Sequence, residues 1–208
     1  MNHSLLILLI LSSLWCNAQQ KTITQIKEEL EKSDNPPLYV KDVLKKKFRM
    51  DTIAVTSIKP FRGLEDSLAF HGKLKKVYGP YKGKVLLQVL ATIPTTFNRV
   101  NQIFLDTSVF LKRFADSLAN VIIENINSGK SSFEDMAQSY SMGGEAATKG
   151  DLGWLAAGLM IPPMEKALQK SKKGELVKVW TPGGLHIIRK IGNPVTGPGY
   201  ALMMRVFM

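Results

Sequence analysis

The residues between Gly150 and Ile188 constrain the fold of this chain more tightly than any other stretch. Glycine and proline divide the stretch into four short units. In order they read Gly150-Asp151-Leu152-Gly153-Trp154, then Met160-Ile161-Pro162-Pro163-Met164-Glu165, then Gly174-Glu175-Leu176, then Thr181-Pro182-Gly183-Gly184-Leu185-His186-Ile187-Ile188. Proline is favoured in the first turn of a helix, and glycine is favoured in tight turns. The order therefore predicts a turn, a short helix that begins at Pro162-Pro163, and two strands over residues 177–179 and 185–187.

Two helices are predicted upstream of this stretch. Apolar residues recur every four positions and predict one buried helix stripe that ends at Gly129; they are Phe110, Phe114, Leu118, Ile122 and Ile126. Ser131 and Glu134 have the spacing of a capping box for the next helix. That helix has an apolar face made by Phe133, Met136, Ala137 and Tyr140, and Ser141 follows it. Residues 100–105 are predicted to form a strand before both helices.

The N-terminal part of the chain is predicted to be a smaller mixture of helices and strands. Thr22 can cap a first helix, and apolar residues over 40–48 predict a second helix with a basic outer face. Residues 52–58 are rich in β-branched side chains and predict a strand, as do residues 77–81 and 85–93. We expect Pro94 to end the last of these strands.

In their order and spacing, the motifs between Phe133 and Ile188 resemble the parvulin family of peptidyl-prolyl cis-trans isomerases. The family pattern runs roughly Phe-x-x-Leu-Ala-x-x-Tyr/Phe-Ser, Gly-Asp-Leu-Gly-Trp, Met-x-Pro-x-Phe-Glu, Gly-Glu and Thr-x-x-Gly-x-His-Ile-Ile. The resemblance implies an α+β domain over residues 98–192, with a four-stranded antiparallel sheet flanked by helices. It leaves residues 19–97 as a separate N-terminal region. Residues 193–208 form a C-terminal tail, in which we expect a strand added to the N-terminal unit.

The resemblance also implies a site for binding and twisting a prolyl peptide bond. The proline pocket falls on Leu152, Met160 and Met164, where the family usually has Phe at the last position. The polar residues of the site match at His186 and Thr181. No metal and no cofactor is implied, and the expected substrates are proline-containing segments of unfolded or exported polypeptides.

Two polar positions of the site depart from the family pattern. A histidine of the first strand is replaced by Gln102, and the Cys or Asp position two residues after Ser141 is Gly143. Gln102 can still donate and accept hydrogen bonds and is kept as a catalytic candidate. Gly143 has no side chain, so we expect an interrupted network and reduced turnover. The alternative is a non-catalytic chaperone or peptide-binding module that has kept the pocket and lost the isomerase network.

The start of the chain predicts export. Residues 4–15 form an apolar run too short to span a bilayer, and Cys16-Asn17-Ala18 follows with small residues before a possible cleavage site. We expect residues 1–18 to be a signal peptide and the mature protein to be periplasmic or secreted, without a membrane span. Lipidation of Cys16 is the alternative, and the bulky Trp15 before it argues against that. Cys16 is the only cysteine, so a mature chain without it forms no disulfide.

The charge of the chain is strongly basic, with a formal net charge of +11 at pH 7. The excess lies more in residues 19–97 than in residues 98–208. The basic runs are short and no nucleic-acid motif accompanies them, so a solvated surface is favoured over a nucleic-acid partner. A membrane- or nucleic-acid-binding protein remains as a third interpretation, and it predicts a steep salt dependence of binding.

Overall fold

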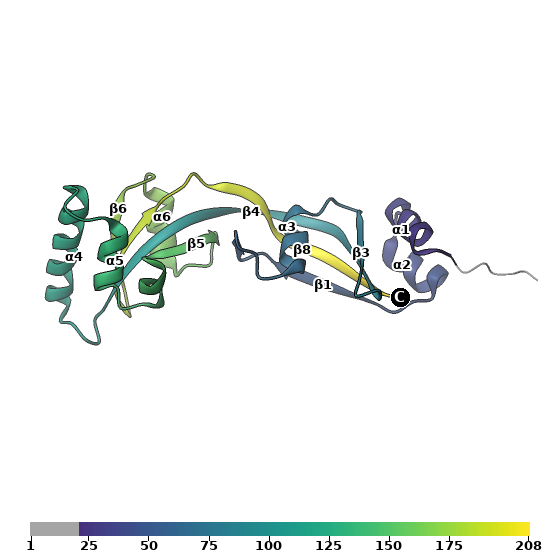
Figure 1. The fold of residues 1–208 in the computed structure, drawn as a ribbon, viewed down its shortest axis with the longest axis horizontal. Coiled ribbons are helices and arrows are strands. Elements are labelled where there is room, and N and C mark those ends of the chain that lie inside the picture. Colours follow the sequence, from purple (N-terminus) through teal and green to yellow (C-terminus); the bar gives the residue numbers. More distant parts are fainter. Residues whose placement is uncertain (1–20) are drawn as a thin grey trace, which may run out of the picture.

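The computed structural model describes residues 21–208, which form a long molecule with most of its helices at the two ends and α3 beside the sheet between them (Figure 1). The expected signal peptide over residues 1–18, with Cys16, lies outside the described residues. We call residues 98–192 the head, and residues 21–97 together with the last strand the arm. Helices α4, α5 and α6 lie at the head end, and α1 and α2 lie at the far end of the arm (Figure 1).

Short helices alternate with strands along the whole described chain. The helical elements are α1 (Ile23–Lys32), α2 (Pro36–Leu38), η1 (Tyr39–Leu44), α3 (Leu64–His71), α4 (Lys112–Asn127), α5 (Phe133–Tyr140), η2 (Gly144–Thr148) and α6 (Pro162–Lys170). The strands are β1 (Phe48–Ala54), β2 (Ser57–Ile58), β3 (Val77–Tyr81), β4 (Val85–Asp106), β5 (Asp151–Ala156), β6 (Leu176–Thr181), β7 (Gly184–Lys190) and β8 (Val195–Phe207).

A single sheet joins the arm to the head. Its main path runs β1-β8-β4-β5-β2, while β3 pairs with β4 in the arm and β6-β7 pairs with β4 in the head. Every one of these strand pairs is antiparallel. Strand β4 is the only one of them that extends along both regions. It therefore connects the arm to the head through continuous strand pairing.

The prediction that Pro94 ends a strand is wrong, because β4 runs through it from Val85 to Asp106. Proline lacks an N–H to give to a neighbouring strand, so it is tolerated in a sheet only at edges or irregularities. Here Pro94 lies opposite Pro198 of β8, and the register shifts between Ile93 and Pro94. The boundary that we placed between residues 97 and 98 therefore lies inside a continuous strand.

The tail over residues 193–208, in which we expected a strand, contains β8. Its register places Val206 opposite Leu86 of β4 and opposite Phe48 of β1. The end of the chain thus returns to the N-terminal unit and lies between two of its strands.

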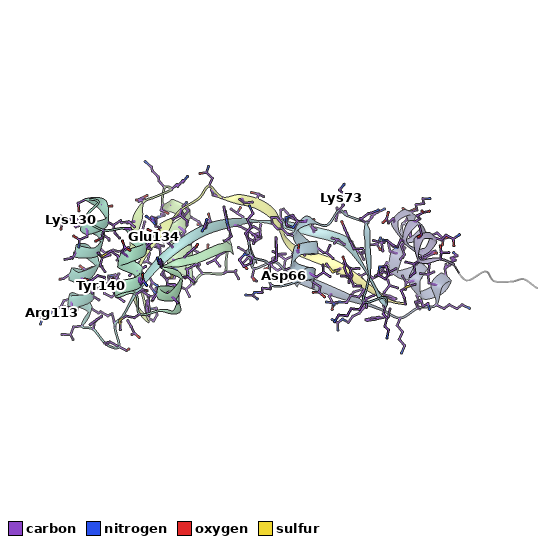
Figure 2. The ribbon with its side chains drawn as sticks, viewed as in Figure 1. Asp66, Lys73, Arg113, Lys130, Glu134 and Tyr140 are labelled. Atoms are coloured by element: carbon purple, nitrogen blue, oxygen red, sulfur yellow. The ribbon has the colours of Figure 1, made fainter. Side chains whose placement is uncertain are left out.

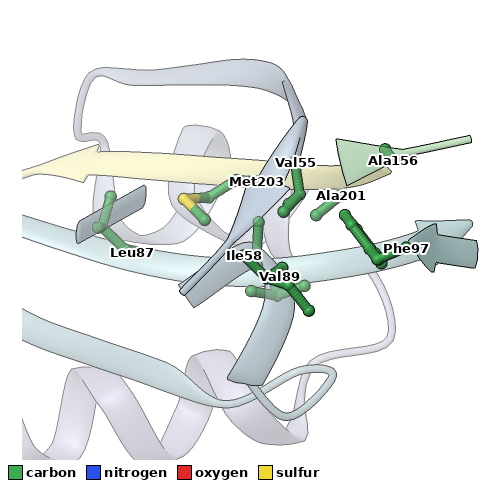
Figure 3. Packing of buried hydrophobic residues seen from close by; sticks show 9 residues of the cluster. Val55, Ile58, Leu87, Val89, Phe97, Ala156, Ala201 and Met203 are labelled. Carbon is green, nitrogen blue, oxygen red and sulfur yellow. The ribbon is translucent and has the colours of Figure 1, made fainter. Parts of the chain in front are cut away.

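Two apolar clusters form the core of the arm. The first lies under α3 between the strands and extends to the head through Ala156 (Figure 3). Its fully or largely buried members are Val55, Ile58, Ala69, Leu87, Val89, Phe97, Ala156, Ala201 and Met203. The second cluster packs α1 and η1 on the other side of β4 and β8; it contains Ile26, Leu30, Val40, Val77, Leu86, Met204 and Val206. Alternate residues of β4 thus serve the two clusters, as the side-chain alternation of a strand requires.

The predicted cap of the first helix is confirmed, whereas the second helix and the first strand differ from the prediction. Thr22 caps α1 in a capping box with Gln25. The second helical segment ends at Leu44, where Lys45 adopts a left-handed conformation with φ of 50°, so Phe48 already belongs to β1. The predicted strand over 52–58 is divided into β1, which ends at Ala54, and β2 over Ser57–Ile58, which pairs with β5 instead of β8. Between them, the N–H of the buried Val55 still donates to the carbonyl of Gly199 in β8 at 2.8 Å.

In the head, the predicted helix stripe is wrong at Phe114, whose side chain is 52% exposed. A spacing of four exceeds the 3.6 residues of a helical turn, so a stripe of that spacing drifts around the helix. The residues of α4 that are buried are Ala115, Ala119 and Ile122. The predicted capping box is displaced by one residue, since Ser132 caps α5 and its Oγ accepts from the N–H of Asp135 at 3.0 Å.

The sheet of the head has the expected fold class, with four antiparallel strands flanked by helices. One face of β4 and β7 carries Ile103, Leu105, Leu185 and Ile187, which pack beneath α4 and α5. The other face carries Val100 and Ile188, and here α6 packs through Met164 and Leu168. The candidate site lies on this second face.

Candidate active site

Three strands of the head bring the predicted polar residues into one row. His186 of β7 lies between Thr181 of β6 and Gln102 of β4. The Thr181 hydroxyl is 3.0 Å from His186 Nε2, and His186 Nδ1 is 3.2 Å from Gln102 Oε1. The register explains the row, because Gln102 and His186 are diagonal neighbours on one face of the β4–β7 pair. Thr181 reaches His186 across the β6–β7 hairpin.

His186 is buried, with 9% of its surface exposed. Burial lowers the pKa of its imidazole below the ordinary value, and the nearby carboxylate of Glu145 opposes this only partly. The ring is therefore neutral at pH 7. The Phe104 ring lies against it, with 4.7 Å between the ring centroids. A neutral imidazole has one donor and one acceptor nitrogen. The residues on either side of His186 therefore determine which of its two nitrogens carries the proton.

The three residues predicted to form the proline pocket belong to one apolar cluster. Met164 of α6 is only 3% exposed, and the partly buried Leu152 and Met160 pack against the same cluster. Val100 and Ile188 supply the strand side of the cluster. Each lies two residues from a polar residue of the row, which is about 7 Å along a strand. Apolar and polar groups thus lie side by side on one face of the sheet.

Two carboxylates hold the loops that carry the pocket residues. Glu165 Oε1 accepts from the N–H groups of Gly158 and Met160 at 2.8 and 3.1 Å, which fixes the loop before α6. Asp151 accepts from the N–H of Gly153 at 2.8 Å and forms an ion pair with Arg99 at 2.7 Å. Burial opposes the charge of Asp151, but the bonds from Arg99 and Gly153 prevail and hold its pKa below the ordinary value. The turn at Leu152 is therefore held by local hydrogen bonds.

The gap that we expected at Gly143 is filled by a residue that the sequence analysis missed. Glu145 lies in η2 and is 9% exposed. Its Oε1 accepts from Gln102 Nε2 at 3.0 Å and from the Ser141 hydroxyl at 2.7 Å. The polar row therefore continues from Gln102 to a carboxylate. The available signal was that Glu145 is the only acidic residue between Ser141 and Gly150.

The loop that carries Glu145 is fixed against β4 by main-chain hydrogen bonds. The N–H of Met142 donates to the carbonyl of Phe104 at 2.8 Å, and the N–H of Phe104 donates to Ser141 Oγ at 2.9 Å. At the other end, the N–H of Gln102 donates to the carbonyl of Gly150 at 2.8 Å.

Helix α5 leads into this loop and is itself bound to the sheet. Glu134 of α5, seen at the head in Figure 2, accepts from Arg189 of β7 at 3.0 Å. The Arg189 guanidinium also lies over the ring of Phe133, 4.4 Å from its centroid. These contacts fix the N-terminal end of α5 to the sheet, and the chain enters the loop from the other end of the helix at Ser141.

Comparison with known proteins supports a function for this region. Residues 111–192 match the family model described as "Rotamase: PPIC-type PPIASE domain". A "Chaperone SurA" of Bordetella avium (strain 197N) is 33% identical over 102 residues, which cover 47% of this chain and 20% of that protein. A "Probable parvulin-type peptidyl-prolyl cis-trans isomerase" of Bordetella bronchiseptica is 39% identical over 77 residues, which cover 36% of this chain and 30% of that protein.

Among solved structures, the chain is similar to a crystal structure of a PpiC-type peptidyl-prolyl cis-trans isomerase domain. The identity is 29%, the match covers 50% of this chain and 94% of that one, and the TM-score is 0.46. The match to the two curated relatives spans less than a third of the length of either. The family model matches residues 111–192, which lie in the head and include Thr181 and His186 of the polar row.

Proposed function

Residues 111–192 of this chain form a parvulin-type domain of the PpiC peptidyl-prolyl isomerase family, and from this premise we propose that the protein catalyses cis–trans isomerisation of prolyl peptide bonds. The substrates proposed are proline-containing segments of unfolded or exported polypeptides. Isomerisation of a prolyl bond needs no cofactor, because rotation about the C–N bond makes and breaks no covalent bond.

One observation carries this proposal, namely the apolar cluster and the polar row on a single face of the head. A prolyl bond presents an apolar ring next to a polar amide. Leu152 and Met160 are partly buried and offer the ring an apolar surface above Met164. His186 and Thr181 lie one pleat further along the sheet, where the amide of a bound residue would follow its ring.

The energetic demand on such a site is small. The barrier to rotation about the peptide bond is about 18–20 kcal/mol, and each tenfold acceleration requires about 1.4 kcal/mol of preferential binding of the twisted state. A thousandfold acceleration therefore requires about 4 kcal/mol. An apolar surface and a few fixed dipoles provide energies of this size when they need no reorganisation during the reaction.

The chain's own residues are proposed to supply these dipoles in fixed orientations. Neutral His186 has Nε2 3.0 Å from the Thr181 hydroxyl and Nδ1 3.2 Å from Gln102 Oε1, so both ring nitrogens are held by neighbouring side chains. A twisted amide has lost its resonance, so its nitrogen becomes a better acceptor and its carbonyl a weaker one. The row and the pocket together favour that state over the planar one by holding the ring and withdrawing the amide from water.

We also propose the site of action and the division of the chain. The apolar run over residues 4–15 and the small residues before Ala18 support export to the periplasm or beyond. Within residues 21–208, no helix combines the length and apolar character that crossing a bilayer requires. Residues 98–192 are proposed as the isomerase domain, and residues 19–97 as an N-terminal region completed by the strand of the tail.

Peptide binding to a Met160→Ala variant tests the location of the pocket. Loss of apolar burial should weaken binding of an Ala-Pro peptide by roughly 1–3 kcal/mol, while the fold persists because Met160 is only partly buried. Val121→Ala is the matched control, since Val121 is 53% exposed on α4, which covers the other face of the sheet. Titration by NMR measures both affinities. Equal affinity of a folded Met160→Ala protein and the wild type would refute this pocket.

A further inference from the structure

The carboxylate of Glu145 occupies the place that a side chain at position 143 would take. A Cβ built on Gly143 would lie 2.2 Å from Glu145 Oε2 and 2.6 Å from Oε1. Both distances are far below contact, so a side chain at position 143 and the present conformation of Glu145 exclude each other. Gly143 has extended backbone with φ of −93°, which any residue can adopt, so backbone strain does not explain the glycine.

Glu145 accepts hydrogen bonds from two donors, and the bond from Gln102 determines which atom is donor and which is acceptor along the whole row. An ionised carboxylate only accepts hydrogen bonds, so the Gln102 amide must turn its nitrogen toward Glu145 and its oxygen toward His186. An amide oxygen also only accepts, so Nδ1 of His186 must carry the proton. Nε2 of the neutral ring is then the acceptor nitrogen, and it competes for the Thr181 hydroxyl proton, at 3.0 Å, with the carbonyl oxygen of Gly184, at 3.2 Å.

We propose that Glu145 is the positioning carboxylate of the isomerase site: it acts through Gln102 to hold His186 in the Nδ1–H form, and it replaces the side chain that is missing at position 143. This inference rests on the proposed function and concerns how the same site is arranged. Glu145 is a positioning residue and not a catalytic one, because Gln102 separates its carboxylate from His186.

A purely structural role would make Glu145 a latch between the loop and β4. Its bond to Ser141 and the main-chain bonds at Met142 and Gly150 serve that purpose as well. The two roles differ in what they predict for His186. If the role is only structural, removing Glu145 loosens the loop. If Glu145 positions His186, its removal also allows the imidazole proton to move from Nδ1 to Nε2.

The experiment compares the mature chain, from residue 19 on, with four variants. Glu145→Ala removes the carboxylate, and Gly143→Asp adds one that collides with it. The double variant Gly143→Asp/Glu145→Ala moves a carboxylate to the space that Glu145 vacates. Glu124→Ala is the matched control, because Glu124 is exposed on α4. The readouts are proline isomerisation measured by NMR exchange and the tautomer of His186 measured from its ¹⁵N shifts.

The proposal predicts a Nδ1–H tautomer of His186 in the wild type and in the double variant. Turnover should fall by about tenfold or more in Glu145→Ala, fall also in Gly143→Asp, and recover in the double variant. Recovery in the double variant is a coupling that independent sites do not show. Glu124→Ala should retain the turnover and the tautomer of the wild type.

Three results would overturn the proposal. These are a Nε2–H tautomer in the wild type, an unchanged tautomer and turnover in folded Glu145→Ala, and a double variant no more active than the single ones. If Glu145→Ala does not fold, the wild-type tautomer and the double variant decide the matter. Absence of turnover in the wild type would contradict the proposed function instead, and the tautomer would still test the role of Glu145.

Discussion

Two glutamines on the same strand show how the arm and the head use buried amides differently. In the arm, Gln88 of β4 is 1% exposed, and its Nε2 donates to the backbone carbonyls of Leu30 and Lys75 at 3.2 and 2.6 Å. In the head, Gln102 of β4 connects the side chains of His186 and Glu145. The first amide satisfies main-chain groups between elements, whereas the second transmits orientation between titratable side chains.

The comparison extends to the surroundings of the two amides. Gln88 lies opposite Val77 and on the same face of β4 as Leu86, both in the second apolar cluster of the arm, and its Oε1 is buried without a hydrogen-bond partner among the described residues. Gln102 has both ends of its amide paired and lies two residues from Val100, which belongs to the apolar cluster that Leu152 and Met160 pack against. A buried polar group that joins other side chains beside an accessible apolar surface is the pattern expected of a site. On this comparison we assign binding and catalysis to the head and a scaffold role to β4 in the arm.

The largest expected effect tests whether β4 makes the two regions one cooperative unit. Phe133→Ala in the head and Leu86→Ala in the arm each remove a fully buried side chain, which costs roughly 2–5 kcal/mol. Because β4 belongs to both regions, each variant should lower the stability of the arm and the head together. Hydrogen exchange followed by mass spectrometry measures both regions in one experiment. If each variant destabilised only its own region, the arm and the head would be independent units.

Next in size is the effect of adding a methyl group at Gly150. Its φ is +84°, and a Cβ would lie 2.8 Å from the carbonyl oxygen of Gln102 and 2.8 Å from the ring of Phe133. Gly150→Ala should therefore cost more than the roughly 1–3 kcal/mol of the left-handed conformation alone. Gly153→Ala and, in the arm, Gly83→Ala are controls with positive φ and open space around the Cβ. Thermal unfolding compares the three, and equal losses would show that the close approach of the loop to β4 is not important.

The two glutamines themselves provide a third test, in which stability and activity should separate. Gln88→Ala loses two hydrogen bonds to the backbone carbonyls of Leu30 and Lys75 and should destabilise by roughly 1–3 kcal/mol without changing turnover. Gln102→Ala should reduce turnover by about tenfold with a smaller loss of stability. Urea unfolding and an isomerisation assay on the same samples measure both quantities. The distinction between the two amides fails if Gln88→Ala lowers turnover as much as Gln102→Ala does.

The smallest expected effect is a difference in the pH at which the two regions lose stability. Burial lowers the pKa of His186, so below about pH 6.5 the unfolded chain binds a proton that the folded chain resists. Stability of the head should then fall as the pH falls from about 6.5 toward the folded pKa. In the arm, burial opposes the charge of Asp51, but hydrogen bonds from Arg205 and Arg49 hold its pKa below the ordinary value.

The sign for Asp51 follows from the same linkage. Its stabilising contribution is present above about pH 4 and is lost as the pH falls through the folded pKa. Acid titration followed by NMR should show the signals of the head responding at higher pH than those around Asp51. A His186→Gln variant should lose the response below about pH 6.5, and retention of that response in the variant would assign it to another group.

The sequence was sufficient for the head where the interactions are local. Thr181 and His186 lie on one hairpin, so their pairing follows from residues close in the chain. The Pro162-Pro163 start of α6 likewise depends on local conformational preference. The local pattern predicted only the strands of the β6–β7 hairpin, and the assignment of Thr181, His186 and Gln102 to one site came from the resemblance to a family.

The remaining features depend on long-range partners that no local pattern reveals. Strand β4 passes Pro94 because β8, from the end of the chain, lies beside it with a shifted register. Glu145 reaches Gln102 because Gly143 leaves its own space empty and the loop is bound to Phe104. Glu145 thus occupies the space of a side chain that would belong two positions earlier. This replacement can be predicted only when the path of the loop is known.

The most direct test of the central claim is the rate of cis–trans exchange of an Ala-Pro peptide, measured by NMR exchange without a protease. The account predicts that the wild-type chain accelerates the exchange. It also predicts that His186→Ala reduces the acceleration by at least about tenfold, which corresponds to about 1.4 kcal/mol, while the peptide still binds at Met160. A wild-type chain that binds the peptide without accelerating its exchange, or a folded His186→Ala variant as fast as the wild type, would contradict it.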